Sequence, residues 1–179
     1  MSKLFVDEIR HSGGANAAMQ FDSTGRVTTP ARPAFLVSRS ATITLTGGDP
    51  HQVLPFDAVQ FDIGSNFSTA NNHYVCPVDG IYFFALNIRL DALTQGTGLY
   101  IRAFIYRGND ASTVTTPWNS KDSFLGMLTG NNDNQYEAGI CSGVLQCTAG
   151  DIVTAMGGHV NDASISFNLQ SQFSGFLVG

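Results

Sequence analysis

The sequence predicts an all-β protein whose main domain is a sandwich or jelly roll. Roughly ten short apolar stretches follow one another across residues 34–179, separated by turns rich in Gly, Pro, Asn and Asp. No stretch of eleven residues shows the apolar period of a helix. The composition agrees, because 19 Gly and 13 Phe accompany only 13% charged residues, which also suggests that surface is hidden in an oligomer.

Residues 1–32 form a separate N-terminal segment and linker. Short strand-like pieces alternate here with Gly and Asp turns, and residues 28–33 contain two prolines that stiffen the chain and forbid a helix. The segment has too little apolar mass for a core of its own. We therefore expect it to depend on partner chains or to be disordered alone.

Residues 33–179 form the main domain, and its strands are predicted from alternation and from turns. Apolar and polar residues alternate in residues 42–46 and 59–63, and the Ala149–Asp151 turn pairs the strands on either side of it as a hairpin. Residues 108–122 are predicted as the longest surface loop. The predicted strands are residues 35–38, 42–46, 59–63, 73–76, 81–90, 99–107, 124–128, 139–147, 152–156, 165–169 and 173–178.

His73–Leu90 is the most informative stretch. It predicts one strand, a turn through Pro77–Gly80 and a long second strand. Alternate residues of Tyr82–Leu90 form an unbroken apolar row, whereas the opposite face is apolar at its start and polar at its end. A strand with one solvated face would be polar along that whole face. We therefore expect the first half of the strand to be covered on both sides, by another sheet or by another copy of the chain.

The last strand, Phe173–Val178, ends one residue before the end of the sequence. Chain ends normally fray, so a strongly apolar terminal strand is unusual. We expect it to lie in the middle of a sheet or against an interface.

The bulk properties disfavour several classes of partner. The net charge is −5, and Lys and Arg do not cluster, so nucleic acid is not expected as a ligand. No apolar run approaches the roughly 20 residues of a membrane helix, so membrane insertion is not expected either. Asp7 and Glu8 interrupt any signal-peptide core near the N-terminus, which predicts folding in a cytoplasm.

The chain has three cysteines, Cys76, Cys141 and Cys147. An odd count without a secretory signal argues against a disulfide framework. Cys141 and Cys147 would stand roughly 20 Å apart on one strand, too far to bridge. We expect buried free thiols that pack as small hydrophobic side chains.

No catalytic residue and no cofactor is expected. The four histidines, His11, His51, His73 and His159, have no spacing typical of a zinc site. A Gly-x-Ser-x-Gly nucleophile elbow is missing. No pair of carboxylates stands out on a strand face as it would in a glycosidase. The sequence therefore indicates a protein that is not an enzyme.

Several motifs, taken in order, resemble the C1q globular domain over about residues 33–179. The most specific are Pro77–Phe84, Pro-Val-Asp-Gly-Ile-Tyr-Phe-Phe, and Phe173–Leu177, Phe-Ser-Gly-Phe-Leu. Ser142–Cys147 followed by Gly-Asp also matches, although the family often has Ser-Gly-Gly where this chain has the single Gly143. The resemblance implies a ten-strand antiparallel jelly-roll sandwich of the C1q/TNF type that forms a tight homotrimer.

The trimer interface is predicted from this resemblance together with the strand that is apolar on both faces. The residues that we assign to it are Ile81, Phe83, Ala85, Phe176 and Val178.

Residues 3–27 resemble a short module of tail-fibre and related virion proteins of marine phages. The similarity rests on Leu4–Ile9, a Gly-Gly pair, an Ala-Ala-Met-Gln-Phe stretch and Asp22–Val27. It implies that residues 1–30 bind another virion protein. The expected location is therefore the virion, on its tail or its head, after assembly in the host cytoplasm.

Calcium is the metal with most support, because C1q-like trimers often hold it near the threefold axis through loop oxygens. An equally physical reading is that these Asn and Asp residues are there to form turns and that no metal binds. The candidate ligands are Asp110, Asp122, Asn131, Asn132, Asp133 and Asn134.

Loop-borne aromatic, amide and charged side chains are the candidates for host contact, with a glycan or a protein as ligand. The predicted receptor-binding region comprises Asn109, Asp110, Trp118, Lys121, Asn132 and Tyr136.

The leading hypothesis is a trimeric phage fibre or spike whose C1q-like head binds a host-surface receptor. The alternative is a structural decoration or cement protein of the capsid or tail that binds no receptor. A glycan-cleaving spike is a third hypothesis, which the lack of a carboxylate pair disfavours.

Overall fold

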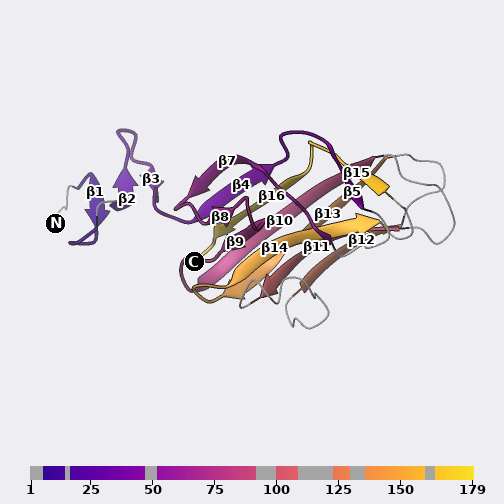
Figure 1. Cartoon of the computed structure of the whole chain (residues 1–179). Coiled ribbons are helices and arrows are strands. Elements are labelled where there is room, and N and C mark those ends of the chain that lie inside the picture. The colour runs from indigo at the N-terminus through magenta and orange to yellow at the C-terminus, as the bar shows by residue number, and fades with distance from the viewer. Residues whose placement is uncertain are drawn as a thin grey trace.

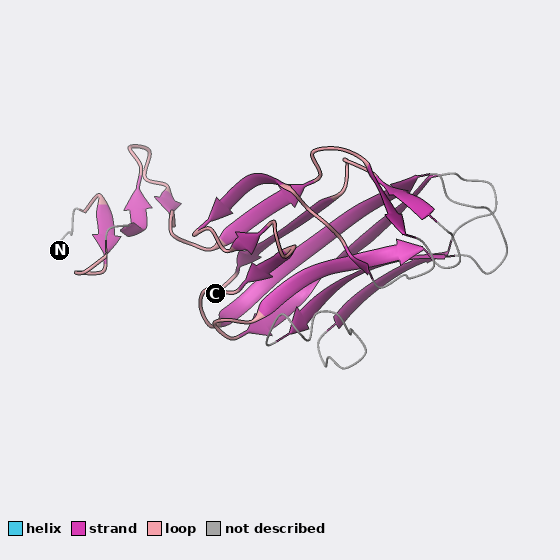
Figure 2. Cartoon of the chain, viewed as in Figure 1, coloured by secondary structure: helices cyan, strands magenta, loops and turns pink. Residues whose placement is uncertain are grey.

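β-strands account for every regular element in the residues that the computed structural model describes, which are 6–14, 17–46, 52–91, 100–108, 123–129, 136–159 and 164–179 (Figures 1 and 2). Figure 1 shows a small three-stranded sheet beside a larger sandwich, which we call the N-terminal sheet and the head. Within these residues no helix combines the length and the hydropathy needed to cross a membrane.

The N-terminal sheet consists of β1 (Glu8–Arg10), β2 (Ala17–Phe21) and β3 (Val27–Thr28), in that order and antiparallel. Asp22 shapes the turn between β2 and β3, because its carboxylate accepts hydrogen bonds from the backbone N–H groups of Thr24 and Arg26, both at 2.9 Å. These bonds and the Thr24 hydroxyl lower the pKa of Asp22 to about 2. The predicted strand pieces are confirmed, and only Ala17 among their described residues is a buried hydrophobic.

The first layer of the head is an antiparallel seven-stranded sheet of order β5-β15-β10-β16-β4-β7, with β13 paired to the other edge of β10. Its strands are β4 (Ala34–Ser38), β5 (Ile43–Thr46), β7 (Ala58–Ile63), β10 (Gly80–Asp91), β13 (Tyr136–Cys147), β15 (Ser164–Phe167) and β16 (Gln172–Leu177).

The second layer is a six-stranded sheet of order β12-β11-β14-β9-β8, with β6 paired to β14. Its strands are β6 (Gln52–Val53), β8 (Phe67–Ser68), β9 (His73–Val75), β11 (Tyr100–Gly108), β12 (Ser123–Thr129) and β14 (Ile152–His159).

The jelly-roll sandwich is confirmed. The described residues of the head contain thirteen strand segments, β4 to β16, where ten strands were expected, because two-residue segments such as β6 and β8 pair separately. The predicted turn through Pro77–Gly80 joins the two sheets, because it carries the chain from β9 in one layer to β10 in the other.

The core lies between the two sheets, and the inward row of β10 is its centre. Tyr82, Phe84, Leu86, Ile88 and Leu90 are all at most 1% exposed, as their alternation predicts. An aromatic cluster packs around this row near Gly80, where β10 begins. The ring centres of Phe35 and Tyr74 lie 4.3 Å apart, and those of Phe35 and Phe173 lie 5.0 Å apart.

The C-terminal strand lies inside the seven-stranded sheet, between β10 and β4, as predicted. The chain end is held as well, since the Ile81 N–H donates to the Gly179 carbonyl at 2.8 Å. Gly175 on β16 faces the core. A Cβ on this residue would stand 2.8 Å from Cε1 of Phe84 and 2.9 Å from Cε1 of Phe35. The Phe-Ser-Gly-Phe-Leu motif thus requires Gly where aromatic rings fill the space of a side chain.

We predict that Gly175→Ala destabilises the protein by about 1–3 kcal/mol, because the rings of the packed core must move to admit the methyl group. Chemical denaturation measures the change. Gly179→Ala is the matched control, because a Cβ there has no neighbour within 4 Å. Equal stability of the two variants would contradict the packing argument.

His73 is a buried titratable residue on β9. The adjacent Tyr74 faces the core, so His73 points to the other side of the six-stranded sheet, where it is nevertheless only 7% exposed. A small second cluster that includes Phe104, Tyr106 and Met156 is buried on the same sheet. Burial lowers the pKa of the His73 imidazole below its ordinary 6.5, because it disfavours the charged form.

We predict that His73 makes the protein less stable as the pH falls below 6.5. The unfolded chain then binds a proton that the folded chain does not yet accept, and each pKa unit of difference removes about 1.4 kcal/mol. The measurement is the denaturation midpoint between pH 7.5 and 5.5. His73→Gln should weaken this pH dependence, whereas the exposed control His11→Gln should preserve it. The same slope in both variants would refute the prediction.

Candidate functional site

The candidate site is the side of the seven-stranded sheet that faces away from the six-stranded sheet, which we call the open face. Five adjacent strands contribute to it in the order β13-β10-β16-β4-β7. Their outward side chains are largely apolar, and seven of them are more than one third exposed. These are Phe61, Ile63, Ile81, Ile140, Val144, Phe176 and Val178.

Strand register makes these side chains neighbours across the sheet. Phe83 lies opposite Val144 on one side and opposite Phe176 on the other, and the two Phe ring centres are 5.4 Å apart. The same row continues through Ala34 to Ile63 on the edge strand β7. A contiguous apolar band therefore crosses the whole sheet. Monomeric soluble proteins rarely expose such a surface, which is typical of an interface.

The five residues predicted for the trimer interface, Ile81, Phe83, Ala85, Phe176 and Val178, all point to the open face. Ile140 and Val144, which are 70% and 54% exposed, were not predicted as interface residues. Alternation along β13 signals that the two share a face, but only the pairing of β13 with β10 shows which face it is. Phe61 was likewise not identified, because alternation alone does not say that its apolar side points outward.

The open face becomes polar toward Asp91, the end of β10, which we call the tip; the opposite end, at Gly80, is the base. Nε of Arg89 lies 2.8 Å from an Asp91 carboxylate oxygen, and its guanidinium also donates to the side chain of Gln170. Its guanidinium carbon lies 5.3 Å from the ring centre of Tyr136, a cation–π contact. Asn168 donates a further side-chain hydrogen bond to Asp91.

The predicted receptor region is only partly described. Tyr136 was expected on a loop, but it is the first residue of β13, where it lies opposite Asp91. Pairing with β10 over twelve residues extends this strand three residues beyond the predicted start. Tyr136 is 59% exposed and available for contact. Asn109, Asp110, Trp118, Lys121 and Asn132 lie outside the described residues.

The candidate calcium ligands, Asp110, Asp122, Asn131, Asn132, Asp133 and Asn134, also lie outside the described residues. Within the described part of the chain, no group of three or more His, Cys, Asp and Glu side chains could hold a metal. Among the histidines, His11 lies between β1 and β2 of the N-terminal sheet, and His73 lies on β9 of the head.

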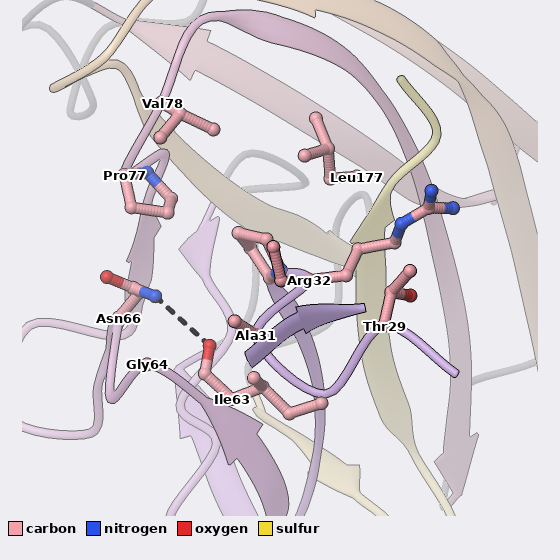
Figure 3. A pocket seen from close by; sticks show the side chains of 11 residues that line it. Thr29, Ala31, Arg32, Ile63, Gly64, Asn66, Pro77, Val78 and Leu177 are labelled. Carbon is pink, nitrogen blue, oxygen red and sulfur yellow. Dashed lines mark hydrogen bonds between the residues drawn. The ribbon is translucent and has the colours of Figure 1, made fainter. Parts of the chain in front are cut away.

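A groove of about 490 Å³ lies where the N-terminal sheet meets the base of the head (Figure 3). Ala18 and Thr29 line it from the N-terminal side, and Pro77 and Leu177 are among the residues that line it from the head. Arg32 is its charged lining residue. The lining is mostly apolar and lacks the several convergent polar groups of a small-molecule site. We therefore interpret the groove as part of the junction between the N-terminal sheet and the head, and not as a small-molecule site.

Comparison with known proteins supports the architecture. The model of the C1q domain family matches residues 34–178. Among solved structures, the globular domain of zebrafish complement 1qA is 18% identical, with a TM-score of 0.56 over 83% of this chain and 98% of that chain. Eiger TNF from S. frugiperda is 13% identical, with a TM-score of 0.52 over 82% of this chain and 91% of that one.

Murine APRIL at pH 8.5 gives a TM-score of 0.56 at 10% identity, over 82% of this chain and 99% of that chain. At these identities the structures establish a shared fold and nothing further. The family match covers the head from its first strand to its last and includes both of the motifs described above. The chain therefore belongs to the C1q domain family.

Proposed function

We propose that this protein is a fibre or spike protein of a bacteriophage particle, a homotrimeric adhesin whose head binds a host-surface receptor. The proposal has three parts, which are trimerisation through the open face, attachment to the particle through the N-terminal sheet, and host contact at the tip of the head. The observation that carries it is the apolar band of the open face on a member of the C1q domain family.

Trimerisation is supported by what the open face would bury. Phe83, Phe176 and Val144 lie side by side there with no covering element among the described residues. Burial contributes about 25 cal/mol for each Å² of apolar surface removed from water. C1q-like domains are often trimeric receptor-binding or structural modules, so a second and third copy are the fitting cover.

Attachment through the N-terminal sheet is supported by its exposed apolar side chains. Ile9 is 49% exposed and Val27 is 54% exposed, and among the described residues of the sheet only Ala17 is a buried hydrophobic residue. Such a sheet has little independent stability and gains from a partner surface. The resemblance of residues 3–27 to a virion-protein module suggests that this partner is another component of a phage particle.

Host contact is assigned to the tip because the tip lies at the end of the head opposite the N-terminal sheet. Figure 1 places the end of β10 and the start of β13 away from the N-terminal sheet. With the sheet anchored, Arg89, Asp91 and the exposed Tyr136 would face outward from the particle. Three copies of a weak site would multiply apparent affinity about 10²–10⁴-fold through avidity. No catalytic step is part of this proposal.

The first test is the mass of the protein in solution. We expect light scattering to give three times the 19.1 kDa protomer mass for the unaltered chain. Val144→Asp should yield folded monomers, because an unpaired carboxylate in an apolar interface costs several kcal/mol. Val27→Asp is the matched control, since this valine has the same 54% exposure on the N-terminal sheet. A wild-type chain that is monomeric in this measurement would contradict the proposal.

The second test separates an adhesin from a cement protein. Fluorescently labelled protein should bind saturably to at least one strain in a panel of marine bacteria, and Val144→Asp should lose most of this binding as avidity disappears. A trimer that binds none of the strains but binds purified phage particles would favour the structural alternative.

A further inference from the structure

Two of the three buried thiols meet at the base of the head. Cys76 directly follows β9 of the six-stranded sheet, and Cys147 is the last residue of β13 in the seven-stranded sheet. They are 0% and 2% exposed and belong to the same core cluster. Both thiols are free, and the two sulfurs are close enough to shift each other's pKa. This pair was not predicted from the sequence, because only the spacing of Cys141 and Cys147 along one strand can be judged there.

The backbone around the pair is tightly held. The Cys76 N–H donates to the Asp151 carbonyl at 2.8 Å, and the Gly150 N–H donates to the Cys76 carbonyl at 2.8 Å. The turn from Thr148 to Asp151 is closed by its own hydrogen bond of 3.0 Å. Cys147 lies immediately before this turn, in register with Gly80. The two sulfurs are thus brought together by fixed main-chain contacts between the two layers.

A cation lies beside the pair. Arg107 on β11 donates to the carbonyl of Gln146 and lies 3.5 Å from the Asp151 carboxylate. The neighbouring Cys76 thiol and the positive charge of Arg107 lower the pKa of Cys147, whereas the neighbouring Cys147 sulfur and burial raise the pKa of Cys76. These opposite shifts favour Cys147 as the thiolate of the pair and Cys76 as its protonated partner.

We propose that Cys76 and Cys147 are a redox site that forms a reversible disulfide when the protein meets a peroxide. The disulfide would join the two sheets of one protomer at the base of the head. The proposal is independent of trimerisation and of the phage assignment, because both sulfurs belong to the same chain.

The chemistry balances with hydrogen peroxide as the oxidant. The Cys147 thiolate attacks one peroxide oxygen and the O–O bond breaks, which gives a sulfenic acid and a hydroxide that leaves as water. The Cys76 sulfur then attacks the Cys147 sulfur, the S–O bond breaks, and the departing hydroxide takes the Cys76 proton as a second water. Each sulfur loses one electron and each peroxide oxygen gains one.

Cys141 supplies an internal control. It is buried on the same strand as Cys147, six residues away, which corresponds to roughly 20 Å. Cys141→Ala removes a buried thiol from the same core but leaves the proposed pair intact. Cys76→Ala and Cys147→Ala each remove one half of the pair.

The test is peroxide treatment of the folded full chain, followed by mass spectrometry. Wild type and Cys141→Ala should lose two hydrogen masses, and dithiothreitol should restore them. After alkylation and trypsin, residues 40–89 should be linked to residues 122–179 in both proteins. Cys76→Ala and Cys147→Ala should show no such link. Thiols that stay reduced, or that gain oxygen without a link, would overturn the proposal.

Stability gives a second readout. Closing the long loop between Cys76 and Cys147 restricts the unfolded chain, so the oxidised protein should unfold at a higher denaturant concentration than the reduced protein. The same rise should occur in Cys141→Ala and be lost in Cys147→Ala. A midpoint that falls on oxidation would mean that the bond distorts the fold, which contradicts a site already built for it.

Discussion

The structure depends on β10, a strand whose two faces are both apolar near its start. Its inward row meets the six-stranded sheet, and the rings of Phe84 and Phe35 close around Gly175 on the neighbouring strand. Its outward row continues across β13 and β16 as the apolar band of the open face. The inner contact is satisfied within one protomer, whereas the proposed trimer would supply the outer contact. The fold and the proposed assembly thus follow from the same strand.

Sequence reasoning recovered what is local. The inward row from Tyr82 to Leu90, the central position of β16 and the strands of the N-terminal segment could all be predicted, because alternation and turn residues act over a few positions. It failed where the answer depends on pairing between distant strands. Whether Phe61 points inward or outward, and which face of β13 continues the band, is decided by register with strands far away in the sequence.

The candidate site shows the same division. The five predicted interface residues share one face because β10 and β16 are neighbours. Ile140 and Val144 were missed because β13 approaches from a part of the chain more than fifty residues away. The contact between Cys76 and Cys147 depends on two turns that meet at the base, a relation that no spacing rule contains. Chemistry that arises from tertiary proximity is thus the part least visible in the sequence.

The place of β16 also gives the head many contacts between distant parts of the sequence. This strand separates β10 from β4 and supplies Phe173 to the aromatic core, so it pairs on both edges with strands that come far earlier in the chain. Such pairing closes large loops before it contributes stability, so we expect the head to fold more slowly than a domain held together by local hairpins.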